Sequence, residues 1–167
     1  ISLYNENQNL TETYSTLFYL GKFLYQVGDI DRARKAFDQT LEFFRNSKNQ
    51  VMVCEILMEM GKLSYDEAEY GNAREYYIEA MQTSEKNGFK KNEALSLLYL
   101  GDIEYNLKNY SVALNYYQKS QELFEEIGTD KYFPYLLSAN GKAYEAIGEI
   151  NKAIGAYKQA IDSINHF

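Results

Sequence analysis

The chain has 167 residues, of which 46% are hydrophobic, and a formal net charge of −7 at pH 7. That length is enough for one domain with its own core. The acidic balance argues against binding to nucleic acid or to an anionic membrane surface, because both require clustered lysine and arginine. Cys54 is the only cysteine, so no internal disulfide can form, which fits a reducing compartment.

No targeting or membrane-spanning segment is visible in the sequence. No apolar stretch approaches the ~20 residues that a membrane-spanning helix needs. The N-terminal residues also lack the basic and apolar run of a signal peptide. We therefore expect a cytoplasmic chain that does not enter a membrane. Because it begins at Ile1 rather than Met, we also expect it to be a fragment of a longer protein or a mature chain without its original start.

A forty-residue repeat runs through the chain. Each repeat contains a glycine, an alanine twelve residues later, and an aromatic residue four residues after that. The glycines are Gly21, Gly61, Gly101 and Gly141; the alanines are Ala33, Ala73, Ala113 and Ala153; the aromatic residues are Phe37, Tyr77, Tyr117 and Tyr157. A fixed period of this length indicates an array of stacked helical units.

Taken in chain order, each repeat splits into two helices. In the first repeat, leucines at positions 17, 20 and 24 have helical spacing, Gly28-Asp29 ends that helix, and a second helix is expected over about 30–44. The later repeats follow the same plan, with second helices expected over 70–86, 110–127 and 150–165. Nothing in the sequence indicates a strand.

Turn residues mark the ends of these helices, because glycine and asparagine tolerate the left-handed backbone found there. Inside the later repeats the expected bends lie at or near Gly71-Asn72, Lys108-Asn109 and Gly148-Glu149. Between repeats they lie at 46–49, 87–88 and 128–130. Pro134 is expected in the first turn of its helix, where its missing N–H is tolerated. We expect the repeated glycine and alanine to let paired helices approach closely, with the aromatic ring in the neighbouring gap.

These motifs resemble the tetratricopeptide repeat (TPR) family. An apolar residue precedes the glycine in Leu20-Gly21, Met60-Gly61 and Leu100-Gly101, whereas the fourth repeat departs with Asn140-Gly141. The second helices read Ala33-x3-Phe37-x2-Thr40, Ala73-x3-Tyr77-x2-Ala80, Ala113-x3-Tyr117-x2-Ser120 and Ala153-x3-Tyr157-x2-Ala160.

The resemblance implies an all-α fold: a right-handed α-solenoid of four helix-turn-helix hairpins, with eight helices in a single domain. The repeats would cover about 10–48, 49–88, 89–128 and 129–167. The usual TPR is about 34 residues long, so this chain is similar to the long-repeat variants found in bacterial peptide-pheromone receptors, in sensor regions of signalling proteins, and in cell-polarity and kinesin-light-chain adaptors. The family's usual closing proline is absent from every repeat.

The resemblance also implies a concave groove lined by the first helix of each hairpin. The candidate groove residues form an apolar row, a row of mostly lysine and a tyrosine row. They are Phe18, Met58 and Leu98; Lys22, Lys62, Asp102 and Lys142; and Tyr25, Tyr65 and Tyr105. Ser138 and Glu145 hold the fourth apolar and tyrosine positions.

Such a groove favours an extended peptide, because tyrosine offers a large apolar face and a hydroxyl group. Its lysines favour a peptide with acidic residues. Three alternatives stay open: the tyrosines could pack between hairpins, the lysines could be solvated tips, and a flanking helix could cover the apolar row. The carboxylate clamp of chaperone adaptors is not expected, because Phe18, Glu59, Leu95 and Tyr99 stand at its polar or basic positions.

Nothing in the sequence favours an enzyme or a bound cofactor. His166 is the only histidine and lies next to the last residue, which excludes a Ser-His or Cys-His pair within the fold and a multi-histidine metal site. Cys54 is expected to be a buried core residue. No glycine-rich phosphate loop is present. We therefore expect no catalytic residues, no cofactor and no metal.

Two functional hypotheses follow. The first is a protein–protein interaction scaffold that binds a partner segment in its groove. The alternative is the peptide-sensing regulatory domain of a larger transcription regulator or signalling protein. In addition, Ile154, Ile161 and Ile164 would leave an apolar edge on the last helix, which predicts a homodimer through the terminal repeat.

Overall fold

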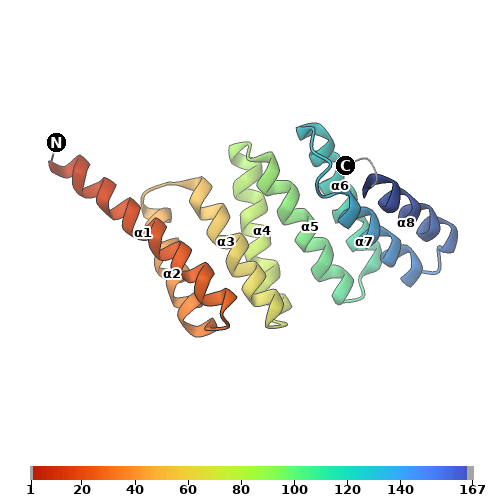
Figure 1. The fold of residues 1–167 in the computed structure, drawn as a ribbon, viewed down its shortest axis with the longest axis horizontal. Helices are drawn as coiled ribbons and strands as arrows, with labels where there is room; N and C mark the ends of the chain where they lie inside the picture. Colours follow the sequence, from red (N-terminus) through yellow and green to blue (C-terminus); the bar gives the residue numbers. More distant parts are fainter. Residues whose placement is uncertain (1, 165–167) are drawn as a thin grey trace. The chain divides into compact units, whose positions relative to one another are not determined.

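The computed structural model describes residues 2–164, and within them it contains eight α-helices and no strand (Figure 1). The helices are α1 (Ser2–Gln26), α2 (Ile30–Asn46), α3 (Gln50–Asp66), α4 (Tyr70–Asn87), α5 (Lys90–Asn106), α6 (Tyr110–Ile127), α7 (Phe133–Ala146) and α8 (Ile150–Ile164). The all-α fold of four helix-turn-helix hairpins is confirmed. In the described residues, no helix has the length and apolar character needed to cross a membrane.

The helices group into two compact units, one ending at Ala80 and the other beginning at Met81, with the boundary inside α4. In the first unit α2 packs against α1 and α3, and α1 also contacts α3. In the second unit α6 packs against α5 and α7, α7 packs against α8, and α5 contacts α7. Within each unit, neighbouring hairpins therefore bring their first helices together.

Each glycine of the repeat lies directly against an aromatic ring of its own hairpin. A Cβ atom placed on Gly101 would lie 2.4 Å from a ring carbon of Tyr117, and one on Gly61 would lie 2.9 Å from the ring of Tyr77. The same contact joins Gly21 to Phe37 and Gly141 to Tyr157. The aromatic ring, rather than the repeated alanine, is therefore the close neighbour of each glycine, which corrects the expected arrangement.

The bends repeat as regularly as the helices. The bend inside each hairpin contains one residue with positive φ, at Gly28, Ala68, Lys108 and Gly148, again forty residues apart. In the second hairpin the left-handed residue is thus Ala68, and Gly71 lies in the first turn of α4. The connections between hairpins use Lys48, Gly88 and Gly128 in the same way.

Two individual expectations are also confirmed. Cys54 is fully buried, and its Sγ lies 3.9 Å from the carbonyl oxygen of Ala80, to which the thiol can donate. Pro134 lies in the first turn of α7. Both residues therefore have structural roles that account for their positions.

Candidate functional site

In the first unit, the candidate groove residues come from α1 and α3. Lys22 and Tyr25 lie on α1, and Met58, Lys62 and Tyr65 lie on α3. The Lys62 ammonium nitrogen lies 5.2 Å from the centroid of the Tyr25 ring, a cation–π contact between the two helices. Lys22, Tyr25 and Lys62 therefore share one surface, which we call the α1–α3 surface.

Two carboxylates that were not among the candidates complete the α1–α3 surface. Lys22 Nζ lies 2.7 Å from Glu59 Oε1, and the Tyr25 hydroxyl donates a hydrogen bond to the Asp66 carboxylate. Burial raises the pKa of Tyr25, and the bond to Asp66 raises it further. The phenol therefore stays protonated and remains a donor at neutral pH.

Phe18 and Leu98 are not exposed on a groove wall. Only 2% of Phe18 and 3% of Leu98 is accessible to solvent, and both side chains belong to the hydrophobic cores of their units. The Phe18 ring lies 5.9 Å from that of Phe37, centroid to centroid. Met58 is half-buried against the same core. In this structure, a ligand could not reach Phe18 or Leu98 without displacing a packed neighbour.

In the second unit, Asp102 occupies the position of the lysine row. Its Oδ1 accepts a hydrogen bond from the Tyr117 hydroxyl at 2.9 Å, and its Oδ2 accepts one from the Tyr135 hydroxyl at 2.8 Å. Burial raises the pKa of Asp102 to about 6, although both tyrosines and the charge of Lys142 act in the opposite direction. Asp102 thus connects α5 to α6 and α7.

The tyrosine row packs mainly within its own hairpins. The Tyr65 ring lies 5.6 Å from the ring of Tyr70, and the Tyr105 ring lies 5.3 Å from that of Tyr110. Tyr25 differs, because it contacts Asp66 and Lys62 of the neighbouring hairpin. The three tyrosines are each partly exposed, so part of each side chain remains accessible to a ligand.

Tetratricopeptide repeat models match residues 15–47 and 52–126, which together make up more than half of the sequence. The chain belongs to the tetratricopeptide repeat family. No curated protein matches the sequence at a significant level. The known use of TPR hairpins is to present a surface to other proteins, since stacked repeats create extended binding surfaces.

Solved structures with a similar fold have very different sequences. BtubC (BKLC) from P. vanneervenii is 16% identical with a TM-score of 0.82, over 92% of this chain and 63% of that one. The apo form of RapI is 17% identical with a TM-score of 0.87, over 93% of this chain and 57% of that one. Aspartyl phosphate phosphatase F from Bacillus subtilis is 15% identical with a TM-score of 0.87, over 93% of this chain and 41% of that one. The TPR chain therefore spans about three fifths or less of each of these proteins, and the likeness concerns the fold.

Sequence reasoning missed Glu59, Asp66 and Tyr135 as parts of the candidate site. Tyr135 has no counterpart in the repeat, because Ser15, Glu55 and Leu95 hold the aligned positions. The repeat pattern therefore gave no signal for it. Glu59 and Asp66 lie two residues before and five after Gly61, so a search for carboxylates near the lysine and tyrosine rows of the TPR pattern would have found them.

Among residues 8–164, whose side chains the structure describes, no group of three or more histidine, cysteine or carboxylate side chains is arranged to hold a metal ion. His166 lies outside the described residues. The arrangement of the candidate residues instead provides hydrogen-bond donors, acceptors and aromatic faces. These groups are suited to binding a polar segment of another molecule.

Proposed function

We propose that this TPR chain is an interaction scaffold that binds an extended segment of a partner protein, without catalytic activity of its own. The α1–α3 surface is the observation that carries the proposal. There an aromatic ring, two ammonium groups and two carboxylates lie together on neighbouring helices and remain partly open to solvent. The cytoplasmic location stays a prediction from the sequence.

The charges on this surface define what it can bind. Lys62 is exposed, whereas Lys22 is already paired with Glu59. A carboxylate of the partner can approach Lys62 directly, and an apolar side chain can pack on the Tyr25 ring beside it. We therefore propose a partner segment with an acidic residue next to an apolar one.

A charge reversal tests this proposal. Lys62→Glu places a negative charge beside Tyr25, and Lys35→Glu makes the same change on the exposed side of α2 as a control. Proteins captured from a lysate of the source organism by the wild type and by Lys35→Glu should be lost by Lys62→Glu. Circular dichroism checks that both variants are folded. Equal capture by all three proteins would contradict a role for the α1–α3 surface.

The alternative function is a peptide-sensing regulatory domain of a larger signalling protein. It is favoured by the likeness to aspartyl phosphate phosphatase F, of which the chain matches only 41%. A sensor changes its conformation or assembly when its ligand binds. Small-angle X-ray scattering with and without the captured partner segment separates the two functions, because a scaffold should keep its radius of gyration.

We also propose that α8 mediates self-association. Ile154, Ile161 and Ile164 are 47%, 60% and 59% exposed along this helix. Phe124 of α6, forty residues before Ile164, is instead fully buried and stacks at 4.5 Å on Tyr132, next to α7. A second copy of the chain could give α8 the cover that α6 receives from the following hairpin.

A further inference from the structure

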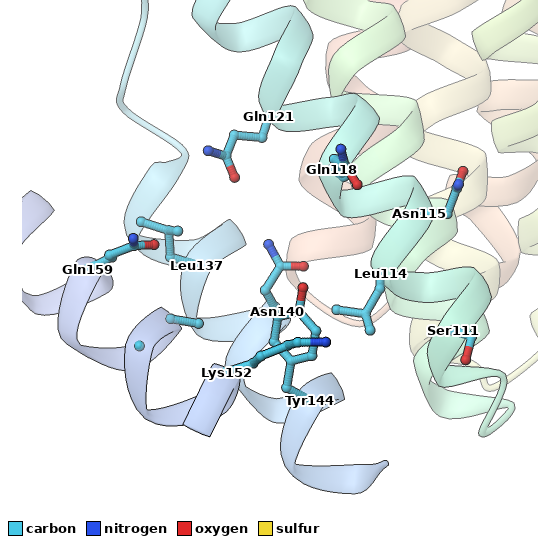
Figure 2. Close-up of a pocket in the computed structure, with 12 residues that line it drawn as sticks. Ser111, Leu114, Asn115, Gln118, Gln121, Leu137, Asn140, Tyr144, Lys152 and Gln159 are labelled. Atoms are coloured by element: carbon cyan, nitrogen blue, oxygen red, sulfur yellow. The ribbon is translucent and has the colours of Figure 1, made fainter. Parts of the chain in front are cut away.

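A pocket of about 540 Å³ opens on the second unit between α6, α7 and α8 (Figure 2). Five carboxamide side chains line it: Asn115, Gln118 and Gln121 from α6, Asn140 from α7 and Gln159 from α8. Lys152 is the one charged side chain among its described lining residues, and no carboxylate lines it. The lining of the pocket thus differs in charge from the chain as a whole, whose net charge is −7.

The pocket is distinct from the candidate groove residues. Asp102, Tyr105 and Lys142 are not among its lining residues. Lys142 follows Asn140 by two residues, which places the two side chains on opposite sides of α7 at about 100° per residue. A ligand in the pocket would therefore leave the Asp102 side of the unit free.

Asn140 does not serve the packing of the repeat. At the aligned positions, Leu20, Met60 and Leu100 are all apolar; Met60 and Leu100 are only 4% and 0% exposed, whereas Leu20 of the first repeat is 44% exposed. Asn140 is partly exposed, and its side chain lies at the centre of the pocket (Figure 2). The other three repeats have an apolar side chain at this position. The amide of Asn140 is therefore better explained by a role in binding than by packing.

Gly155 gives a second and independent observation. It lies inside α8, where glycine is less favourable than alanine. Unlike Gly101 and Gly141, which meet aromatic rings, Gly155 has no protein atom within 4 Å of a Cβ placed on it. Nothing in the fold requires glycine here, but its absent side chain leaves the α8 backbone open to a ligand in the pocket.

The polar groups of the pocket provide both acceptors and donors. Gln118 Nε2 donates to Glu122 at 3.0 Å, and Gln121 Nε2 donates to Glu125 at 2.9 Å. These bonds leave the two amide carbonyl oxygens available as acceptors. Asn140 offers a donor and an acceptor on one group, and the Lys152 ammonium donates from the α8 side.

We propose that this pocket is a second binding site, which takes the main chain of an extended, uncharged peptide segment. Every peptide group carries one N–H donor and one C=O acceptor, which is the pairing that carboxamide side chains match. A single lysine is too little positive charge for a phosphate-rich ligand. The proposal goes beyond the α1–α3 surface and does not depend on it.

Selection from a phage-displayed library of random linear 12-residue peptides on the full chain tests the proposal. The enriched peptides are synthesised, and their dissociation constants are measured for the wild type, for the pocket variants Gly155→Ala and Asn140→Leu, and for Gly71→Ala and Lys62→Glu outside the pocket. We expect at least one peptide to bind both variants at least tenfold more weakly. The melting temperatures of both variants should rise, because each change restores the residue type that the fold favours. Loss of binding together with a gain in stability excludes unfolding as the cause.

Gly71→Ala is the matched control, because Gly71 also has no protein atom within 4 Å of a placed Cβ and lies outside the pocket. It should leave the affinity unchanged. Peptides that are N-methylated along the main chain should no longer bind, since their N–H donors are removed.

The proposal is overturned if no peptide is enriched, if every enriched peptide binds Gly155→Ala as tightly as the wild type, or if N-methylated analogues bind equally well. Peptides that lose affinity only for Lys62→Glu would locate binding on the α1–α3 surface. That outcome would overturn the pocket proposal and support the proposed function.

Discussion

The contact between Gly101 and Tyr117 illustrates how single residues determine the hairpin. The Tyr117 ring occupies the space that any side chain on Gly101 would need, and its hydroxyl donates a hydrogen bond to Asp102. The same ring therefore closes the hairpin and fixes a polar group of the candidate site. A change at the glycine should affect both stability and the Asp102 cluster.

Replacing Gly101 by alanine should destabilise the chain by about 1–3 kcal/mol, because the new methyl group overlaps the Tyr117 ring and forces it to shift. Gly71→Ala, where no atom obstructs the methyl group, should instead stabilise the chain by about 0.5–1 kcal/mol. Urea denaturation followed by circular dichroism measures both values. Equal effects of the two substitutions would show that the close contact is not what retains the glycine.

Asp102 should give the stability a specific pH dependence. Its folded-state pKa of about 6 lies above its ordinary value of 3.8. The folded chain therefore binds this proton more tightly than the unfolded chain does, and the contribution of Asp102 to stability is lost as the pH rises from about 4 to about 6. Relative to Asp102→Asn, the wild type should lose up to about 3 kcal/mol over that interval.

The measurement is urea denaturation of both proteins between pH 3.5 and 7.5. The other carboxylates are the same in both chains and cancel in the difference. A difference between the two proteins that does not change across this pH range would contradict a raised pKa of Asp102.

At the scale of helices and bends, the forty-residue period determines where the chain turns. The second helices begin at Ile30, Tyr70, Tyr110 and Ile150, as the sequence predicts. The residue type at the left-handed bend position is less regular, with glycine at 28 and 148 but Ala68 and Lys108 between them. A backbone conformation imposed by the repeat can thus be occupied by a residue that does not prefer it.

Ala68→Gly should therefore stabilise the chain by about 0.5–1 kcal/mol, since glycine adopts positive φ without steric penalty. The opposite change at the equivalent bend, Gly28→Ala, should destabilise it by about 1 kcal/mol or more. Thermal and urea denaturation of the two variants check the pair. If Ala68→Gly lowers stability, the positive φ at this bend is not a source of strain.

At this scale, some features of the structure could be predicted from the sequence and others could not. Helix positions follow from a pattern that is repeated four times, so they could be predicted, and the burial of Cys54 could be predicted from its residue type. The contact of each repeat glycine with an aromatic ring was not predicted, because the sequence pattern did not distinguish the ring from the alanine as its neighbour. The pairing of Lys22 with Glu59 and of Asp102 with Tyr135 could not, because it depends on how neighbouring helices align. The apolar row was also expected in a groove, although Phe18 and Leu98 point into the core. A first helix that packs against its hairpin partner and also against its neighbour has little surface left to expose.

For the whole molecule, the exposed isoleucines of α8 predict self-association. Ile161→Lys, at a residue that is 60% exposed, should shift a concentration-dependent dimer to a monomer in sedimentation equilibrium. Val27→Lys introduces the same charge at a residue that is 59% exposed near the first bend, and it should leave the oligomeric state unchanged. A wild type that stays monomeric up to high concentration would exclude this interface.

The ion pair between Lys22 and Glu59 has a consequence for recognition by salt bridges. A partner's carboxylate can engage Lys22 only by displacing Glu59, so one favourable contact is exchanged for another of the same kind. Added salt weakens the internal pair and the intermolecular pair together. Association through Lys22 should therefore vary little with ionic strength, and the preference of the α1–α3 surface for an acidic partner should depend on Lys62.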